Sequence, residues 1–288
     1  MSTLAEPPVE VADGYRAGRT LPFRVELVRQ LKRRRTMVMG GVLFALPIIL
    51  LIAFQVGGDP GGNNNRLNLM DTATASGANF AAVNLFSAAG FLLVIPVALF
   101  CGDTVASEAS WSSLRYLLAA PVPRARLLWS KLAVGLSLSL AAMVLLPIVA
   151  LLVGTAAYGW GPLQLPTGGT LPTGTAAQRL LIVVVYIMVS QLVTAALAFW
   201  LSTRTDAPLG AVGGAVFLTI IGSVLDEVTA LGDWRHFLPA HWQYAWLDAV
   251  RPQLEWSDMI QGTSISVTYA LVLFALAFRG FARKDVVS

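Results

Sequence analysis

Residues 101–131 read CGDTVASEASWSSLRYLLAAPVPRARLLWSK. This stretch is the one strongly polar interval between two long apolar runs that carry no charged residue. Asp103 and Glu108 lie near its start, and basic residues collect toward its end, from Arg115 to Lys131. A polar segment of this length between two apolar runs predicts a connection that leaves the membrane on one side and returns to it.

Within this interval, three leucines recur at helical spacing, at Leu114, Leu117 and Leu118. This spacing predicts an amphipathic helix that lies along a face of the membrane. Pro121 and Pro123 are expected to end that helix, because proline lacks the amide hydrogen and crowds the preceding turn.

The order of residues here resembles that of bacterial ABC-2 type transporter permeases of the nitrous-oxide-reductase-maturation and gliding-export kind. In those proteins a Glu precedes a Gly-Thr-Leu-Arg-like step, a Leu-Leu pair, a Pro-Val-x-Arg turn and a Lys that opens the next membrane helix. The chain departs from that pattern at Ser112 and Ser113, and the local match covers roughly a tenth of its length. The matching residues are Glu108, Ser112, Ser113, Leu114, Arg115, Leu117, Leu118, Pro121, Val122, Pro123, Arg124 and Lys131.

The composition excludes an ordinary soluble domain. Of the 288 residues 56% are apolar and 12% are charged, and the mean hydropathy is +0.68. Six runs are long enough to cross a bilayer as helices, and none contains Asp, Glu, Lys or Arg. We therefore expect an all-α polytopic membrane protein with six transmembrane helices. The predicted spans are residues 37–56, 79–101, 132–157, 180–201, 208–225 and 259–278.

The basic residues are distributed unequally between the two sides that these spans define. Sixteen of the 20 Lys and Arg residues fall in residues 1–36, 102–131, 202–207 and 279–288. By the positive-inside rule, both termini and the 102–131 interval face the cytoplasm. The resemblance to bacterial permeases implies the bacterial inner membrane as the location. The high isoelectric point thus indicates orientation in a lipid bilayer, and no nucleic-acid partner is expected.

The residues before the first span divide into two parts. Residues 1–20 are polar and are expected to form a disordered cytoplasmic tail. Residues 21–36 place Val25 and Val28 on one side of a helix and Arg24 and Arg29 on the other, which predicts an amphipathic helix on an anionic leaflet. A similar elbow helix precedes the first span in the resembled family; the alternative is a plain basic anchor. Residues 37–288 would form the permease domain.

The predicted outer loop at residues 226–258 is acidic and rich in aromatic residues. Such rings favour the headgroup level, so short helices are expected there, acting as a cap over the outer mouth or as a gate.

Polar and small residues inside the spans have two interpretations. Polar side chains line a substrate path or form hydrogen bonds between helices. Gly210 and Gly214 form a G-x-x-x-G pair that permits close helix packing, within one subunit or across a dimer. Pro47, Pro96 and Pro147 are expected to kink the first three spans, as fixed bends or as hinges. The possible path residues are Asn79, Asn84, Ser87, Ser190, Gln191 and Thr194.

The sequence provides little for catalysis. It contains no nucleotide-binding G-x-x-x-x-G-K-[ST] loop. Cys101 is the single cysteine, and His236 and His241 lack the partners of a usual metal motif. We therefore expect no catalytic site, no metal site and no cofactor in this chain.

The resemblance implies the transmembrane subunit of an ATP-binding-cassette exporter, working as two permeases with two separate ATPases that bind ATP and Mg²⁺. The cytoplasmic segment would be the coupling helix, which docks on the ATPase through Glu108, Leu114, Arg115, Leu117, Leu118, Pro121, Arg124 and Lys131. Three alternatives stay open: a lipid-bound loop without a partner, a non-transporting anchor or assembly factor, and an intramembrane enzyme.

Overall fold

The computed structural model describes residues 23–57, 69–110 and 123–283, and these residues are almost entirely helical. Five helical stretches are long and apolar enough to cross a membrane, and a sixth is added if the bent pair α3 and α4 counts as one span. The long elements are α2 (Arg34–Gly57), α3 (Gly77–Ala89), α4 (Val94–Ser110), α6 (Arg124–Tyr158), α7 (Thr173–Ser190), α8 (Leu192–Arg204), α9 (Pro208–Asp226) and α10 (Ser257–Ala282). The expected helical membrane architecture is thus present in its main outline.

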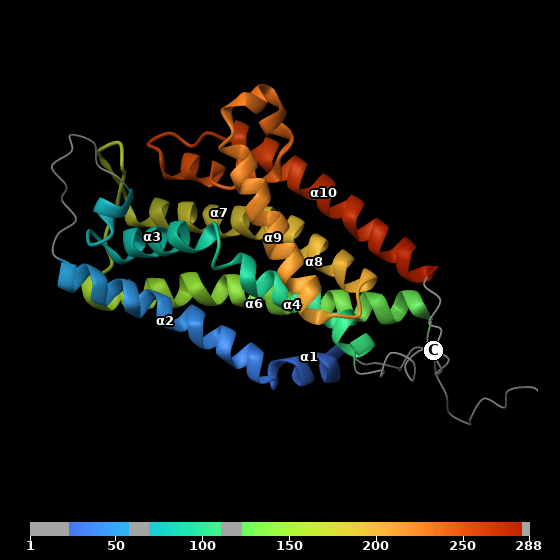
Figure 1. Ribbon diagram of the computed structural model, residues 1–288. Helices are drawn as coiled ribbons and strands as arrows, with labels where there is room; N and C mark the ends of the chain where they lie inside the picture. Colours follow the sequence, from blue (N-terminus) through green and yellow to red (C-terminus); the bar gives the residue numbers. More distant parts are fainter. Residues whose placement is uncertain (1–22, 58–68, 111–122, 284–288) are drawn as a thin grey trace, which may run out of the picture.

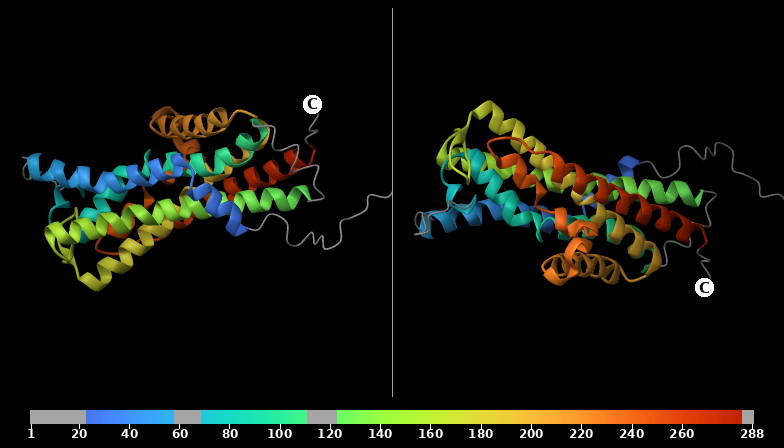
Figure 2. Two further views of the ribbon diagram at one scale, coloured as in Figure 1. Left: turned by 90° about the horizontal axis from the view of Figure 1, so that it is seen from below. Right: turned by 90° about the horizontal axis from the view of Figure 1, so that it is seen from above.

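Most of the helices lie side by side along the axis that α6 follows for its whole 35-residue length, whereas α9 crosses this axis obliquely (Figure 1). The helices α2, α3 and α4 pack on α6, while α8 packs on α4, α9 and α10. In both views of Figure 2, α9 lies at the edge of the bundle. The apolar segments of α2 and α9 are mostly uncovered by the rest of the chain, as expected of helices that face lipid.

Two of the expected spans are interrupted near their middles. Between α3 and α4 the chain bends by 52° over residues 90–93. Pro96 stands in the first turn of α4, where its missing amide hydrogen costs no helical bond, so the bend lies just before it. Between α7 and α8 the interruption is Gln191 alone. Pro47 and Pro147 lie inside α2 and α6.

One end of the bundle is covered by short elements. These are η2 (Leu69–Thr72), the two-residue strands β1 (Leu163–Gln164) and β2 (Thr170–Leu171), and the 3-10 helices η3 (Thr229–Phe237), η4 (Pro239–Trp242) and η5 (Ala245–Val250). The short helices expected in residues 226–258 are therefore present, and they pack on α7, α9 and α10.

Small residues allow close packing between helices. A Cβ atom added at Gly102 would lie 3.1 Å from Val212 of α9, and one added at Gly135 would lie 2.9 Å from the carbonyl oxygen of Phe100. Gly214 of the predicted G-x-x-x-G pair lies against Leu201 of α8, within the chain, whereas the neighbours of Gly210 belong to its own preceding turn. The contact at Gly214 thus favours packing within one subunit.

A side-chain hydrogen bond also joins α4 to α8. The hydroxyl oxygen of Ser202, fully buried, accepts from the backbone amides of Val105 and Ala106 at 3.1 and 2.9 Å. These two helices are therefore fixed to each other at a defined register.

The polar interval at residues 102–131 is shorter than the sequence indicates. Helix α4 continues through Ser110 and α6 begins at Arg124, so most of the interval belongs to the two flanking helices. The predicted tail at residues 1–20 lies outside the described residues. So do five of the predicted docking residues: Leu114, Arg115, Leu117, Leu118 and Pro121.

Candidate functional site

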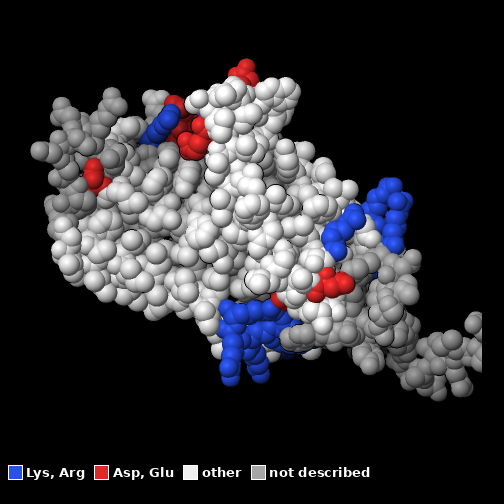
Figure 3. Space-filling view, in the orientation of Figure 1, with Lys and Arg blue, Asp and Glu red and all other residues white. Residues whose placement is uncertain are grey.

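Charged residues gather at the two ends of the bundle and leave a wide uncharged band between them (Figure 3). The basic end comprises α1 (Phe23–Leu31), the starts of α2 and α6, and the ends of α4, α8 and α10. The acidic end carries η2, the β1–β2 pair and η3 to η5. Residues from all three regions line one shared pocket, so these elements lie close together. An uncharged band flanked by charged ends is typical of a membrane-spanning protein.

A cluster of buried ion pairs joins three helices at the basic end. Lys131 of α6 pairs with Glu108 of α4 and, at 2.9 Å, with Glu26 of α1. Arg29 contacts the same two carboxylates, Glu26 at 2.7 Å and Glu108 at 2.6 Å. Glu108 and Lys131 are each only 3% exposed. The two carboxylates and two cations balance in charge, which permits the burial of Glu26, Glu108 and Lys131, while the side chain of Arg29 is half exposed.

A second group of ion pairs lies next to this cluster. Asp103 of α4, also buried, pairs with Arg33 at 3.0 Å and with Arg35 at the start of α2. The hydroxyl group of Thr36 donates to the backbone carbonyl of Gln30, 2.8 Å away, and so ties the end of α1 to α2. The connection between α1 and α2 is therefore held against α4.

The pKa of Glu26 reflects these contacts. Burial raises the pKa of a carboxyl, but at Glu26 the charge of Lys131 and hydrogen bonds from Arg29, Lys131 and Gln30 outweigh it. The pKa of Glu26 consequently lies below its ordinary value of 4.5. Glu26 thus stays ionised at neutral pH, as its ion pair with Lys131 requires.

Helix α1 is amphipathic in an unusual way. Its buried residues are the polar Glu26 and Gln30, whereas Val25, Val28 and Leu31 are exposed. An apolar face that the rest of the chain leaves uncovered, on a helix flanked by arginines, is typical of a helix at a membrane interface.

These contacts correct one expectation about the docking residues. Glu108 and Lys131 were expected to face an ATPase, but both side chains point inward and bind each other. Arg124 is exposed, and its guanidinium group donates to the backbone carbonyl of Ala282 at 3.3 Å. The sequence did not predict the cluster because Glu26 and Lys131 are 105 positions apart. The sequence signal for such a cluster was the position of Glu108 and Lys131 near the ends of two predicted spans.

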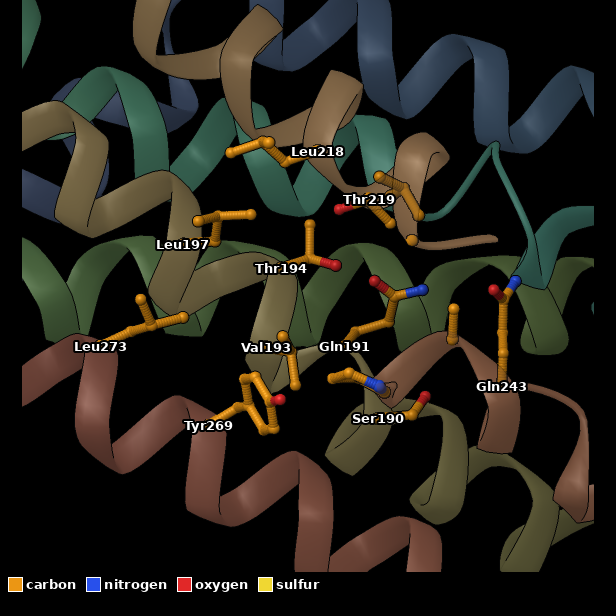
Figure 4. A pocket seen from close by; sticks show the side chains of 14 residues that line it. Ser190, Gln191, Val193, Thr194, Leu197, Leu218, Thr219, Gln243, Tyr269 and Leu273 are labelled. Atoms are coloured by element: carbon orange, nitrogen blue, oxygen red, sulfur yellow. The ribbon is translucent and has the colours of Figure 1, made fainter. Parts of the chain in front are cut away.

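The second site is a mainly apolar pocket of about 290 Å³ between α8, α9 and α10, covered at one side by η4 (Figure 4). Three of the predicted path residues, Ser190, Gln191 and Thr194, line it together. Pro239 and Ala240 of η4 also line it, so the predicted outer cap contributes to the pocket wall. The polar groups around the pocket are Ser190, Gln191, Thr194, Thr219, Gln243 and Tyr269.

Gln191 occupies a distinctive position in this pocket. The residue is 95% buried at the interruption between α7 and α8, and its side-chain amide nitrogen donates to the carbonyl oxygen of Ala89, 3.2 Å away. Ala89 is the last residue of α3, next to the other interruption. One side chain therefore links the single-residue interruption between α7 and α8 to the bend between α3 and α4.

The other predicted path residues have structural roles. Both ends of the Asn79 amide bind the backbone of Gln164, with donor–acceptor distances of 2.8 and 2.9 Å. Asn84 and Ser87 each donate to the carbonyl oxygen one turn earlier in α3. The structure thus divides the six residues between a pocket and helix α3.

The two histidines lie at the acidic end. The Nδ1 atom of His241 is 2.6 Å from a carboxylate oxygen of Asp226, and its ring packs against those of His236 and Trp242. Within the described ranges, no three His, Cys, Asp or Glu side chains form a group able to hold a metal ion.

The comparison with known families covers most of the chain. Residues 62–287 match the model of a family described as a protein of unknown function (DUF2705). The chain belongs to the DUF2705 family. No curated protein matches it. The matched range includes Glu108, Lys131 and the whole pocket, and it begins after α1 and α2.

Proposed function

We propose that this chain is the transmembrane subunit of an ATP-binding-cassette exporter. The observation that carries the proposal is the buried ion pair of Glu108 with Lys131, because these residues stand in the two helices that flank residues 111–122. In the residue order that resembles ABC-2 type permeases, this same segment is the coupling helix.

The ion-pair cluster holds together the two helices, α4 and α6, that precede and follow that segment. A partner that displaces residues 111–122 pushes on the end of α4 and the start of α6 together. Lys131 and Arg29 bind Glu108 and Glu26, so α1 moves with them. Helix α4 then carries the displacement over about 25 Å, since each residue of a helix adds about 1.5 Å. At its far end stands the interruption at residues 90–93.

In this proposal the basic end faces the cytoplasm of a bacterial cell and α1 is the elbow helix. Its exposed Val25, Val28 and Leu31 lie in the inner leaflet, while Arg24 and Lys32 meet anionic headgroups. The six spans are then α2, α3 with α4, α6, α7 with α8, α9 and α10, and both chain ends are cytoplasmic.

The partner supplies the energy. A separate ATPase subunit binds ATP and Mg²⁺, and two permease subunits, two copies of this chain or one with a homologue, assemble with two such subunits. The surface offered to the ATPase would consist of Leu114, Arg115, Leu117, Leu118, Pro121 and Arg124, with apolar anchors that seat in a groove and arginines that fix the register.

Co-purification tests this proposal. The tagged chain, extracted from its native membrane, is expected to bring down a Walker-motif ATPase that is identified by mass spectrometry. The double variant Arg115→Glu with Leu118→Asp should stay in the membrane and lose the ATPase. Arg34→Glu is the matched control, because it reverses one exposed charge at the same end.

Retention of the ATPase by the double variant would refute the docking assignment. The competing function, a non-transporting anchor or assembly factor, predicts an ATPase partner whose turnover does not respond to any transported compound. Turnover of the reconstituted complex in vesicles distinguishes the two.

A further inference from the structure

The pocket between α8, α9 and α10 is lined by apolar and uncharged polar side chains. Among the residues that the structure describes, the buried Oε1 atom of Gln191 has no hydrogen-bond partner. Its orientation follows from chemistry, because the carbonyl of Ala89 only accepts and must therefore face the NH₂ group of the amide. Figure 4 shows the amide extending into the space near Thr194 and Thr219.

Two hydroxyl groups add to this acceptor character. Ser190 donates its hydrogen to the carbonyl of Ile187, 2.9 Å away, and Thr219 donates to that of Ala215 at the same distance. With their hydrogens bound within their own helices, both groups offer lone pairs to the pocket. A donor on a bound molecule finds acceptors at these groups, and Thr194, Gln243 and Tyr269 also line the pocket with groups that can donate.

The remaining lining sets the rest of the ligand's character. None of the residues that line the pocket is Asp, Glu, Lys, Arg or His, and Leu197, Leu218 and Leu273 form much of its wall. A charged ligand would be costly to bury there without a partner of opposite charge. An apolar body, in contrast, gains about 25 cal/mol for each Å² that it buries.

From this arrangement we infer that the pocket binds a neutral, mainly apolar molecule whose hydroxyl or N–H group donates to Gln191. The ligand's donor would complete the bonding of Gln191, which connects the α7–α8 interruption to the end of α3 through Ala89. A ligand in the pocket would thus contact the residue at one interruption, and through its bond to Ala89 would affect the angle between α3 and α4. Binding requires only this chain; the assignment of the ligand as exporter cargo rests on the proposed function.

Two fluorescent probes, one with an N–H group and one without, test the inference. N-phenyl-1-naphthylamine is neutral, apolar and has one N–H group; its N-methyl derivative has none. The purified chain in lipid nanodiscs should bind the first about tenfold more tightly, which corresponds to one hydrogen bond. Gln191→Leu should make the affinities for the two probes equal. A general loosening of the fold would weaken the binding of both probes and leave the ratio of their affinities unchanged.

A pair of glycine variants tests the location. Gly222→Leu should lower probe affinity at least tenfold, because the new side chain enters the pocket while its Cβ has only ordinary contact with Ala240 at 3.7 Å. Gly213→Leu is the control on the same helix, since a Cβ there meets nothing within 4 Å. Equal affinity for both probes, full binding by Gly222→Leu, or equally tight binding of an alkylammonium analogue would each overturn the inference.

Competition identifies the source of the ligand. Displacement of the probe by 1,2-dioctanoylglycerol but not by its O-methyl ether would assign a membrane lipid with a free hydroxyl group. Displacement by benzanilide alone would assign a small aromatic compound, and failure of both would overturn the proposed ligand class. Probe binding by a chain that brings down no ATPase would support this inference and count against the proposed function.

Discussion

The ammonium group of Lys131 and the carboxylate of Glu108 form an ion pair that is closed off from solvent between α6 and α4. Burial of this pair makes it a fixed joint, because separation would leave each member with one charged partner fewer in a region of low polarity. Glu26 and Arg29 extend the joint to α1.

Removal of the cation should destabilise the protein. Lys131→Met leaves two buried carboxylates with Arg29 as their remaining charged partner among these four residues, which should cost about 3–5 kcal/mol. The addition of Glu108→Gln restores the charge balance and should recover most of that loss. Lys32→Met is the control, because Lys32 is exposed. Thermal or denaturant unfolding in detergent measures all four proteins, and equal stability of Lys131→Met and the wild type would contradict the joint.

Acid should weaken the attachment of α1. The pKa of Glu26 in the folded chain is below 4.5, so its contribution is fully present above that value and is lost as the pH falls through the folded pKa. The melting temperature of the wild type should therefore drop more steeply below pH 4.5 than that of Glu26→Gln. Parallel pH profiles for the two proteins would argue against a depressed pKa.

The contact between α10, α7 and η4 should not tolerate a methyl group. A Cβ at Gly262 would lie 2.6 Å from the Cβ of Trp242 and would also collide with the hydroxyl of Tyr186, which donates to the carbonyl of Trp242. Gly262→Ala should cost about 1–3 kcal/mol through overpacking. Gly213→Ala should have little effect on unfolding, because nothing lies within 4 Å of the added atom.

Cysteine labelling can test the orientation of the two ends. Cys101 is buried, so a cysteine introduced at an exposed position is the reactive one. In intact cells a membrane-impermeant maleimide should label Trp234→Cys at the acidic end and should not label Arg24→Cys at the basic end. Both should react after the cells are opened; the reverse pattern in intact cells would place the acidic end in the cytoplasm.

The sequence predicts well where the long apolar helices lie, and less well where they end. The run at residues 37–56 lies within α2 and that at 208–225 lies within α9, because long uninterrupted apolar runs leave few alternatives. Helices α4 and α6 extend beyond their predicted spans, however, since charges such as Asp103 and Lys131 are accommodated by partners distant in sequence. Hydropathy alone contains no information about such partners.

The candidate sites show the same division. Polar residues in apolar runs pointed to Ser190, Gln191 and Thr194, and the structure brings these three to one pocket. The same rule selected Asn79, which instead binds the backbone of Gln164 across the β1 strand. Whether a polar side chain faces a cavity or a neighbouring backbone depends on tertiary packing, which one sequence does not reveal.

The double hydrogen bond that Ser202 accepts from α4 limits how this bundle can rearrange. For α4 to slide along α8, two amide groups would have to give up their acceptor in surroundings without water to replace it. Helices α4 and α8 should therefore move together as one rigid body. Any change of shape is then left to the bend at residues 90–93 before α4 and to the single-residue interruption at Gln191 before α8.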